Sequence, residues 1–410
     1  MTIDLIPDVG LKALAKLKGR TLHVPDPSPW YSDVPSGFNR HYARLVPKVG
    51  GILESVIQDP KALRKAKGID VAHLTCALFP VAEWDVLLIF AHYSVWIFLW
   101  DDEVDRALPE LQVDPNGDGT SPAAPQPTIA SDLNLGNAYR AQSLRYIGHH
   151  LGIHEDPAED AALAAGGRCR CRENLGTDAR GELVPPTPAS GLYVFMGREL
   201  RARCDEGEIR RFWEQICNFA AATAVEQAHR LSGRFPSLED YWRIRYYGGG
   251  ALIHAALAVM KCGNNAPVSM SDLSEPIQSQ FNIMLDDFNK NVLISNDIFS
   301  LKKELTDGTL TNMFVVALAE ADVAGGDHAQ QILAEAVAKF EETTRATVEA
   351  ADEIRRQAKH DAAPGHAESA AKFASSLEMM LHGFLTWTLY TARYGIKGLV
   401  QPDGSVIIKL

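Results

Sequence analysis

Asn296, Ser300 and Glu304 stand four residues apart in the segment NDIFSLKKE, which covers residues 296–304. Positions i, i+4 and i+8 of an α-helix drift by only a small angle, so these three side chains share one face. An amide oxygen, a hydroxyl and a carboxylate on one stripe can together chelate a hard cation such as Mg²⁺. Taken alone, the same nine residues are also compatible with a solvated helix surface.

Two charged neighbours of this stripe take different roles. Asp297 lies off the stripe, so we assign it a structural or supporting role rather than a place among the metal ligands. Lys303 lies close to the stripe, where its ammonium group can reach an anion that the metal holds. The segment therefore combines a set of metal ligands with a cation for an anionic ligand.

A second acidic cluster lies far upstream, at the end of an apolar run. In WIFLWDDEVDR, Asp101 and Asp105 are one helical turn apart and Asp102 is adjacent. Acidic helix ends are common in solvent, but three carboxylates here repel one another and oppose the helix dipole. Mg²⁺ would remove this repulsion, because it prefers carboxylate and phosphate oxygens. Together, the two clusters indicate a metal site more strongly than either does alone.

The elements that must position these residues are predicted to be helices. Apolar residues recur with helical spacing through most of the chain. The residues SLED at 237–240 form a capping pattern, and three glycines at 248–250 interrupt the helix that follows. Strand-like alternation is weak and confined to SVIIKL at 405–410. The predicted helices cover residues 85–108, 208–231, 237–260, 279–305, 326–358 and 376–394. In residues 181–203 a Pro-rich entry precedes the helical pattern.

Two segments rich in Pro, Gly, Asp and Ser are predicted to be loops. Residues 107–136 form the longer one, a mobile excursion, and residues 176–189 the shorter one. Helices of the same apolar character stand on both sides of each loop. We therefore predict an all-α fold with one domain over residues 1–410, ending in a short tail at 396–410.

Composition limits the classes of partner. Hydrophobic residues make up 46% of the 410-residue chain and charged residues 22%, as in soluble proteins with a large core. The formal net charge of −12 argues against nucleic-acid binding. An anionic substrate stays compatible with this charge if divalent cations bridge it to the protein.

The cysteines and the apolar segments indicate a cellular location. The six cysteines lack zinc-site spacing, so we expect free thiols in a reducing compartment. The N-terminus shows no secretory signal pattern, and the apolar run at 86–100 is short for a membrane span. We expect a cytoplasmic protein without membrane insertion. The cysteines are Cys76, Cys169, Cys171, Cys204, Cys217 and Cys262.

The pairing of DDxxD at 101–105 with NDxxSxxxE at 296–304 resembles the two metal motifs of class I terpene cyclases, especially the microbial and fungal sesquiterpene synthases. In LEDYWRIRYYGGG, Arg245, Gly248 and Gly249 match the family's diphosphate-sensing, linker and effector positions, with Arg243 as a competitor for the sensor. The resemblance runs from about residue 37 to 394 and leaves the 107–136 loop unmatched.

Two further segments carry the resemblance. Arg393-Tyr394 in TWTLYTARY matches a late Arg-Tyr dipeptide that contacts diphosphate in the family, with Trp387 six residues earlier. The segment GFNRHY at 37–42 is similar to the family's N-terminal NPHY-type segment, but Arg40 replaces the usual Pro, which weakens this match.

The resemblance implies a bundle of α-helices around a central apolar cavity. It also implies three Mg²⁺ ions, with Mn²⁺ as a substitute, that bridge the protein to a small prenyl diphosphate. Family members are often dimers, so a homodimer is a further expectation. The implied metal ligands are Asp101, Asp102, Asp105, Asn296, Ser300 and Glu304. The implied diphosphate ligands are Arg245, Lys303, Arg393 and Tyr394.

The expected activity is ionisation and cyclisation of farnesyl diphosphate to a sesquiterpene hydrocarbon or alcohol, with release of diphosphate. The cation requires a dry pocket with aromatic walls, for which we name Phe98 and Trp387, and as further candidates Trp96 and Tyr93. The glycines at 248–250 either turn backbone carbonyls into this cavity or form a plain kink.

Three alternatives stay open. A diterpene cyclase would use geranylgeranyl diphosphate, and a prenyltransferase would use a second substrate. Chain-elongating relatives carry two DDxxD motifs, whereas in LDDFNKN at 285–291 Lys290 stands where a third acid would be needed. This difference favours cyclisation. The alternative outside enzymes is a helical scaffold whose acids are merely solvated.

Overall fold

The computed structural model describes residues 6–105, 127–153, 175–232, 235–307, 311–324, 328–361 and 363–410. Almost all regular structure within these ranges is helical, which confirms the predicted all-α class. The first six helices are α1 (Ile6–Leu17), α2 (Tyr42–Val56), α3 (Pro60–Gly68), α4 (Val71–Leu78), α5 (Trp84–Asp105) and α6 (Leu133–Leu151). The next five are α9 (Tyr193–Arg203), α10 (Glu206–Ser232), α11 (Leu238–Gly248), α12 (Ala251–Ala258) and α13 (Lys261–Asn264). The last four are α14 (Glu275–Asp307), α15 (Met313–Ala324), α16 (Ala329–Ala358) and α17 (His366–Tyr390).

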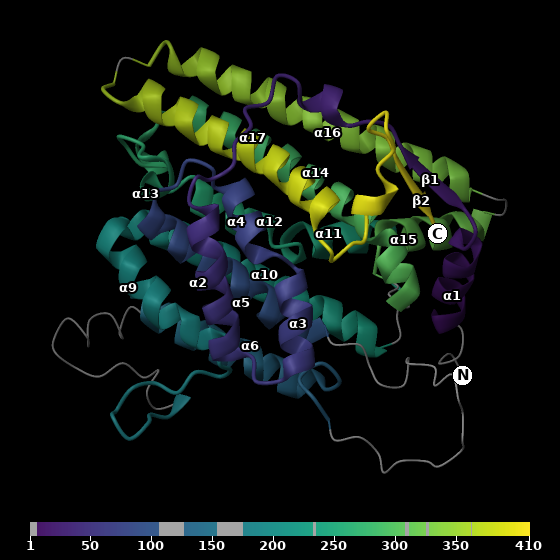
Figure 1. Ribbon diagram of the computed structural model, residues 1–410, viewed down its shortest axis with the longest axis horizontal. Helices are drawn as coiled ribbons and strands as arrows, with labels where there is room; N and C mark the ends of the chain where they lie inside the picture. Colours follow the sequence, from purple (N-terminus) through teal and green to yellow (C-terminus); the bar gives the residue numbers. More distant parts are fainter. Residues whose placement is uncertain are drawn as a thin grey trace.

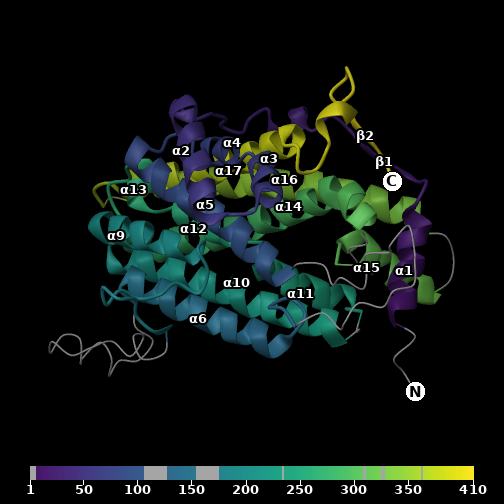
Figure 2. The same cartoon turned by 60° about the horizontal axis from the view of Figure 1, so that its bottom comes forward.

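The long helices form two groups. α14, α16 and α17 pack along one another on one side of the molecule (Figure 1). α6, α9 and α10 form the other group, and Figure 2 shows α6 and α10 running side by side below α5. Helix α5 contacts α9 and α10 in this group, as well as α2 and α4 near α17. The acidic cluster therefore sits on a helix that lies between the two groups.

Close packing of α17 on α4 depends on a glycine. A Cβ atom on Gly383 would lie 2.1 Å from the Ala77 carbonyl oxygen, so a larger residue would push the helices apart. Since α17 leads directly to residues 391–394, this contact fixes the position from which the late Arg-Tyr dipeptide leaves the bundle.

The ends of the described chain meet in a two-stranded antiparallel sheet. Strand β1 (Thr21–Val24) pairs with β2 (Val406–Lys409), with Thr21 opposite Lys409 and Val24 opposite Val406. The weak strand pattern at 405–410 is confirmed, but its partner was not predicted. A strand of four residues carries too little local pattern to be recognised before its partner is known.

The predicted loop boundaries need one correction. Residues 106–126 lie outside the described residues, and the extension of the predicted loop to residue 136 is wrong, because α6 begins at Leu133. The Asp132 carboxylate accepts hydrogen bonds from the backbone N–H groups of Asn134 and Leu135, and so caps this helix. The loop at 176–189 is confirmed, with one isolated bridge between Thr177 and Leu183. None of the helices in the described ranges is long and apolar enough to cross a membrane.

Candidate active site

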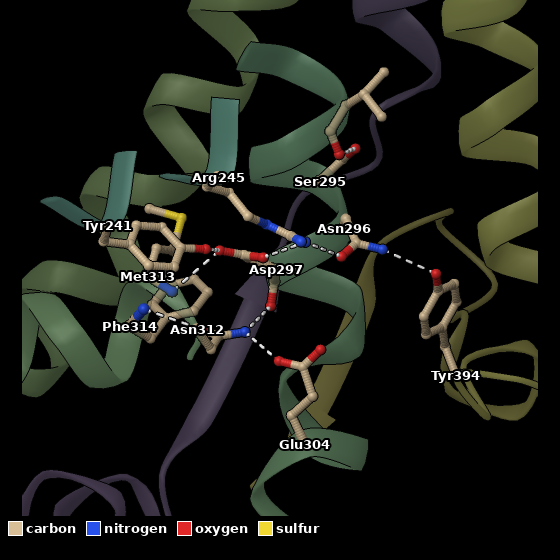
Figure 3. A network of polar contacts seen from close by, with 11 residues as sticks. Tyr241, Arg245, Ser295, Asn296, Asp297, Glu304, Asn312, Met313, Phe314 and Tyr394 are labelled. Carbon is tan, nitrogen blue, oxygen red and sulfur yellow. Dashed lines mark hydrogen bonds and ion pairs between the residues drawn. The ribbon is translucent and has the colours of Figure 1, made fainter. Parts of the chain in front are cut away.

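The predicted metal-binding stripe lies near the C-terminal end of α14. Ser300 is buried, whereas Asn296 and Glu304 are partly exposed. The Asn296 side chain bridges two other elements (Figure 3): its Oδ1 accepts a hydrogen bond from Arg245 Nη2 at 2.6 Å, and its Nδ2 donates to the Tyr394 hydroxyl at 2.9 Å. Asn296 therefore links α14 to α11 and to the segment after α17.

The helix break follows Arg245 by three residues. α11 ends at Gly248, and Gly250, with φ of 72°, precedes α12. A Cβ atom on Gly249 would lie 2.0 Å from Leu293 Cδ2, so a larger residue here would force the buried Leu293 side chain of α14 to move. The chain thus changes direction between α11 and α12 at the glycine triplet. The absence of side chains there lets the last turn of α11, which carries Arg245, approach the stripe closely.

Asp297 holds Arg245 in place. Its carboxylate is 1% exposed and accepts hydrogen bonds from the Tyr241 hydroxyl, from Arg245 Nη2 at 3.1 Å and from the Met313 backbone N–H at 3.0 Å. Burial alone would lower the pKa of Arg245, but the negative charge of Asp297 raises this pKa well above its usual range. Asp297 thus has the supporting role expected from its position off the stripe.

The acidic cluster ends α5, where Asp101 and Asp102 are partly exposed. Lys65 Nζ lies 3.9 Å from an Asp102 carboxylate oxygen. Arg230 Nη2 of α10 donates a hydrogen bond of 2.6 Å to the Val104 carbonyl oxygen. A guanidinium at this position partly neutralises the negative end of the helix dipole and so stabilises the end of α5. The counter-charge that the cluster requires is thus supplied in part by a residue that the sequence analysis did not identify.

The Arg393–Tyr394 dipeptide lies between the two clusters. Burial alone would lower the pKa of Arg393, whereas the Tyr394 hydroxyl and the carboxylates of Asp102 and Asp101 raise this pKa above its usual range. Tyr394, the next residue, is 6% exposed and accepts the hydrogen bond from Asn296. One dipeptide therefore contacts the α14 stripe and lies within electrostatic reach of the α5 carboxylates.

This dipeptide does not belong to a helix, so the predicted helix end at residue 394 is wrong. α17 ends at Tyr390, and Thr391 has extended backbone with ψ of 144°. The Thr391 hydroxyl and Trp387 Nε1 both donate to the Ile69 carbonyl oxygen, at 3.0 and 2.9 Å. These long-range hydrogen bonds end the helix early, and they place the dipeptide in a segment that leaves α17.

Phe98 and Trp387 belong to one aromatic cluster. Their ring centroids are 6.0 Å apart, and Trp387 also contacts Phe384 at 5.7 Å and Tyr394 at 5.6 Å. Phe98 is partly exposed, and the Arg393 guanidinium carbon lies 5.2 Å from its ring centroid. The two predicted aromatic residues therefore lie beside the predicted diphosphate ligands.

The further candidates Tyr93 and Trp96 lie elsewhere. Both side chains are fully buried, with Tyr93 against Phe212 at 5.7 Å and Trp96 against Tyr193 at 5.0 Å. They pack α5 against α9 and α10, on a different face of α5 from Phe98. They therefore lie apart from the cluster of Phe98 and Trp387 and pack in the core between these helices.

The structure places three other residues that the sequence singled out. Asp105 is the last residue of α5, and its side chain lies outside the described residues. Lys303 is partly exposed on α14, next to Glu304. Asp286 forms an ion pair of 2.5 Å with Lys290 one turn along α14, which suits a solvated helix face.

The α14 stripe has the chemistry to hold a hard cation. The pKa of Glu304 is raised by burial and by the nearby Asp297 carboxylate, so a positive charge would stabilise its ionised form. The buried Ser300 hydroxyl lacks a hydrogen-bond partner of good geometry within the described residues. Asn296 adds an amide oxygen, now accepting from Arg245. Across the described ranges, no three His, Cys, Asp or Glu side chains gather as a metal site. The stripe itself offers carboxylate, amide and hydroxyl oxygens, which are ligands that Mg²⁺ accepts.

Three residues that support this site were not predicted from the sequence. Tyr241 donates to Asp297, Arg230 to the end of α5, and Asn312 to Glu304 at 2.8 Å. An Asn directly before the apolar run MFVVALA at 313–319 is a recognisable helix-capping signal. The contact with Glu304 has no signal in the sequence, because it depends on how α15 packs against α14.

Several known proteins have a similar sequence or a similar fold. The family model described as terpene synthase family 2, C-terminal metal binding, matches residues 159–348, which include Arg245 and the α14 stripe. Sesquiterpene cyclase hepA of Aspergillus oryzae is 24% identical over 94% of this chain and 92% of its own length. (+)-Eremophilene synthase of Sorangium cellulosum is 23% identical over 85% of this chain and 86% of its own. Residues 159–348 therefore belong to terpene synthase family 2, and the similarity to microbial sesquiterpene cyclases extends over most of the chain.

The fold of this terpene synthase agrees with solved structures. Hedycaryol synthase superposes with a TM-score of 0.58, over 86% of this chain and 95% of that one, at 15% identity. The enzyme is thus a lyase whose reaction class is cyclisation of a prenyl diphosphate, and its C-terminal part belongs to a metal-binding family.

Proposed function

We propose that this terpene synthase uses Mg²⁺ to ionise farnesyl diphosphate and cyclises the cation to a sesquiterpene hydrocarbon or alcohol, releasing diphosphate. The observation that carries the proposal is the Arg393–Tyr394 dipeptide, which hydrogen-bonds to Asn296 and lies within electrostatic reach of Asp101 and Asp102. The size of the substrate is supported by the two relatives, which are named sesquiterpene cyclase and eremophilene synthase.

The metal would be held by the two motifs. Asn296, Ser300 and Glu304 offer oxygens from α14, and Asp101 and Asp102, with Asp105, offer carboxylates from α5. Bound Mg²⁺ supplies charge that stabilises the developing negative charge on the diphosphate oxygens. Three ions, as the family resemblance implies, would neutralise a diphosphate that a rim of carboxylates otherwise repels.

The remaining steps rest on cationic and aromatic side chains. Arg245, Arg393 and Lys303 donate hydrogen bonds to the diphosphate, together with the Tyr394 hydroxyl, and so stabilise the leaving group as the C–O bond ionises. Phe98 lies beside Arg393 and presents a π-face to the allyl cation. Buried apolar side chains around Trp387 exclude the water that would trap this cation.

Incubation of the purified enzyme with Mg²⁺ and either farnesyl or geranylgeranyl diphosphate tests this function. We expect a cyclic C15 product by gas chromatography of the extract, with stoichiometric release of diphosphate. Products from geranylgeranyl diphosphate alone would instead identify a diterpene cyclase. Chain extension with isopentenyl diphosphate would identify a prenyltransferase. The absence of turnover, with no thermal stabilisation by Mg²⁺ and inorganic diphosphate, would support a scaffold.

Phe98→Ala should change the product mixture more than it changes folding. Its ring is partly exposed, so its loss costs less than the about 3–5 kcal/mol typical of a fully buried Phe. Loss of the aromatic face beside Arg393 should redirect the cyclisation or cause the cation to be quenched at an earlier stage. Gas chromatography of the extract measures the resulting change in the product mixture. Phe281→Ala is the matched control, because Phe281 is 1% exposed and packs on Phe373 within the helix layer. This control should lose stability and keep the product profile. An unchanged profile in Phe98→Ala would remove Phe98 from the pocket.

A further inference from the structure

Asn312, the residue before α15, makes contacts with two parts of α14. It is fully buried, and its Nδ2 donates to Glu304 Oε2 at 2.8 Å and to the Asp297 carbonyl oxygen at 3.1 Å (Figure 3). Its Oδ1 accepts from the Phe314 backbone N–H at 3.0 Å. One side chain therefore caps α15 and at the same time holds the carboxylate that ends the predicted metal-binding stripe.

The neighbouring backbone strengthens this junction. The Met313 N–H donates to the Asp297 carboxylate, so the positive end of the α15 dipole faces the acid that also holds Arg245. At the start of α11, the Leu238 N–H donates to Glu320 Oε2 of α15 at 2.7 Å. α15 is thus tied to α14 and to α11, and these contacts fix the backbone from which the Asn312 side chain extends.

A hydrogen bond of this kind controls what a carboxylate can bind. An ionised carboxylate rotates about its terminal bond unless a donor fixes its plane, and donors behind a metal ligand commonly change metal affinity 10–100-fold. Nδ2 of Asn312 is a fixed donor, since both of its hydrogen bonds are made inside the protein. The orientation of Glu304 is therefore set by α15 as well as by its own helix.

We propose that Asn312 is a positioning residue for metal binding, because its Nδ2–H group fixes the Glu304 carboxylate in the orientation that receives the metal ion. The proposal rests on the proposed function, in which Glu304 is a metal ligand. It assigns to Asn312 a role beyond helix capping, and the two roles can be separated by mutation.

Asn312→Ser and Asn312→Asp separate capping from positioning. Both replacements can accept a hydrogen bond from the Phe314 N–H and so cap α15, but the Ser hydroxyl is too short to reach Glu304 and the Asp carboxylate offers no donor. We expect Asn312→Ser to bind Mn²⁺ about tenfold more weakly in the presence of inorganic diphosphate, measured by the electron paramagnetic resonance signal of free Mn²⁺. The Mg²⁺ concentration for half-maximal diphosphate release should rise by a similar factor, with kcat largely restored at saturating Mg²⁺. Asn312→Asp also lacks the donor, but its added negative charge attracts the metal ion, so Asn312→Ser is the decisive variant.

Asn264→Ser is the matched control. Asn264 is also buried, its Oδ1 also accepts from the N–H two residues on, and its Nδ2 donates to the Ala258 carbonyl oxygen and to Ser376, away from the stripe. This control should lower the unfolding midpoint and leave the Mn²⁺ affinity unchanged. A Glu304→Gln background gives a second test, in which Asn312→Ser should cause little further loss of affinity if it acts through Glu304.

The outcomes distinguish this inference from the proposed function. If the wild type releases diphosphate and binds Mn²⁺, but Asn312→Ser matches it in metal affinity, then Asn312 is only a cap and the inference is overturned. Equal losses in the wild-type and Glu304→Gln backgrounds would overturn it as well. A wild type that neither binds Mn²⁺ with diphosphate nor turns over a prenyl diphosphate would overturn the proposed function itself.

Discussion

Asn296→Ala is expected to abolish turnover of farnesyl diphosphate while the helix content stays unchanged. The substitution removes the amide oxygen of the stripe and both of its contacts, those with Arg245 and Tyr394. Loss of a residue behind a metal ligand commonly costs 10–100-fold, so loss of a ligand that also positions two diphosphate donors should cost more than about a hundredfold. The measurement is diphosphate release with saturating Mg²⁺, together with circular dichroism.

Asp101→Ala tests the opposite side of the same site. It should reduce turnover to a comparable degree, since the proposed function requires both the α5 carboxylates and the α14 stripe for metal binding. Asp286→Ala is the control on α14, because this acid lies in a half-exposed ion pair with Lys290 and should have wild-type activity. Full activity of purified Asn296→Ala or Asp101→Ala would remove that residue from the metal assignment.

The second large effect is expected at Asp297. Asp297→Ala leaves the Arg245 guanidinium without its ion-pair partner and two further donors, the Tyr241 hydroxyl and the Met313 N–H, without an acceptor. Breaking one side of a buried ion pair typically costs 3–5 kcal/mol, and Arg245 is 23% exposed, so we expect the free energy of unfolding to fall by about 3 kcal/mol. Turnover should also fall, because Arg245 is no longer held beside Asn296. Denaturant unfolding monitored by circular dichroism measures the first effect.

Two comparisons make this result specific. Asp286→Ala breaks an ion pair on the same helix that is about 40% exposed on both sides, and should cost less than about 1 kcal/mol. Asp297→Asn keeps the size of the side chain but removes the charge. Its loss of unfolding free energy should lie between those of Asp297→Ala and Asp286→Ala. A loss for Asp297→Ala no greater than for Asp286→Ala would contradict the role of Asp297 as the acceptor that joins α11, α14 and α15.

Local patterns in the sequence predicted much of the framework. The helical spacing identified α14 and the common face of Asn296, Ser300 and Glu304. The SLED pattern located the start of α11, where the Ser237 hydroxyl accepts from the Asp240 N–H, and the glycine triplet located its end. Capping, periodicity and glycine breaks act within one or two turns of helix, so they can be recognised from neighbouring residues alone.

Contacts between distant segments could not be predicted in this way. Thr391 ends α17 because its hydroxyl bonds to the Ile69 carbonyl oxygen, more than three hundred residues away in the chain. Tyr93 and Phe98 lie on the same predicted helix, and only the packing of α5 shows that Tyr93 contacts Phe212 in the core whereas Phe98 lies beside Arg393. The pairing of β1 with β2 likewise joins the two ends of the described chain.

The sequence by itself determined which helix faces offer oxygens suited to a metal or cations suited to a diphosphate, because residue type and helical spacing set the chemistry of each face. Only the tertiary structure decided that Arg393–Tyr394 lies between the two motifs and that Asn312 and Asp297 hold Glu304 and Arg245. The physical reason is that hydrogen bonds and ion pairs between helices depend on crossing points set by the packing of the whole core, and no single helix carries that information.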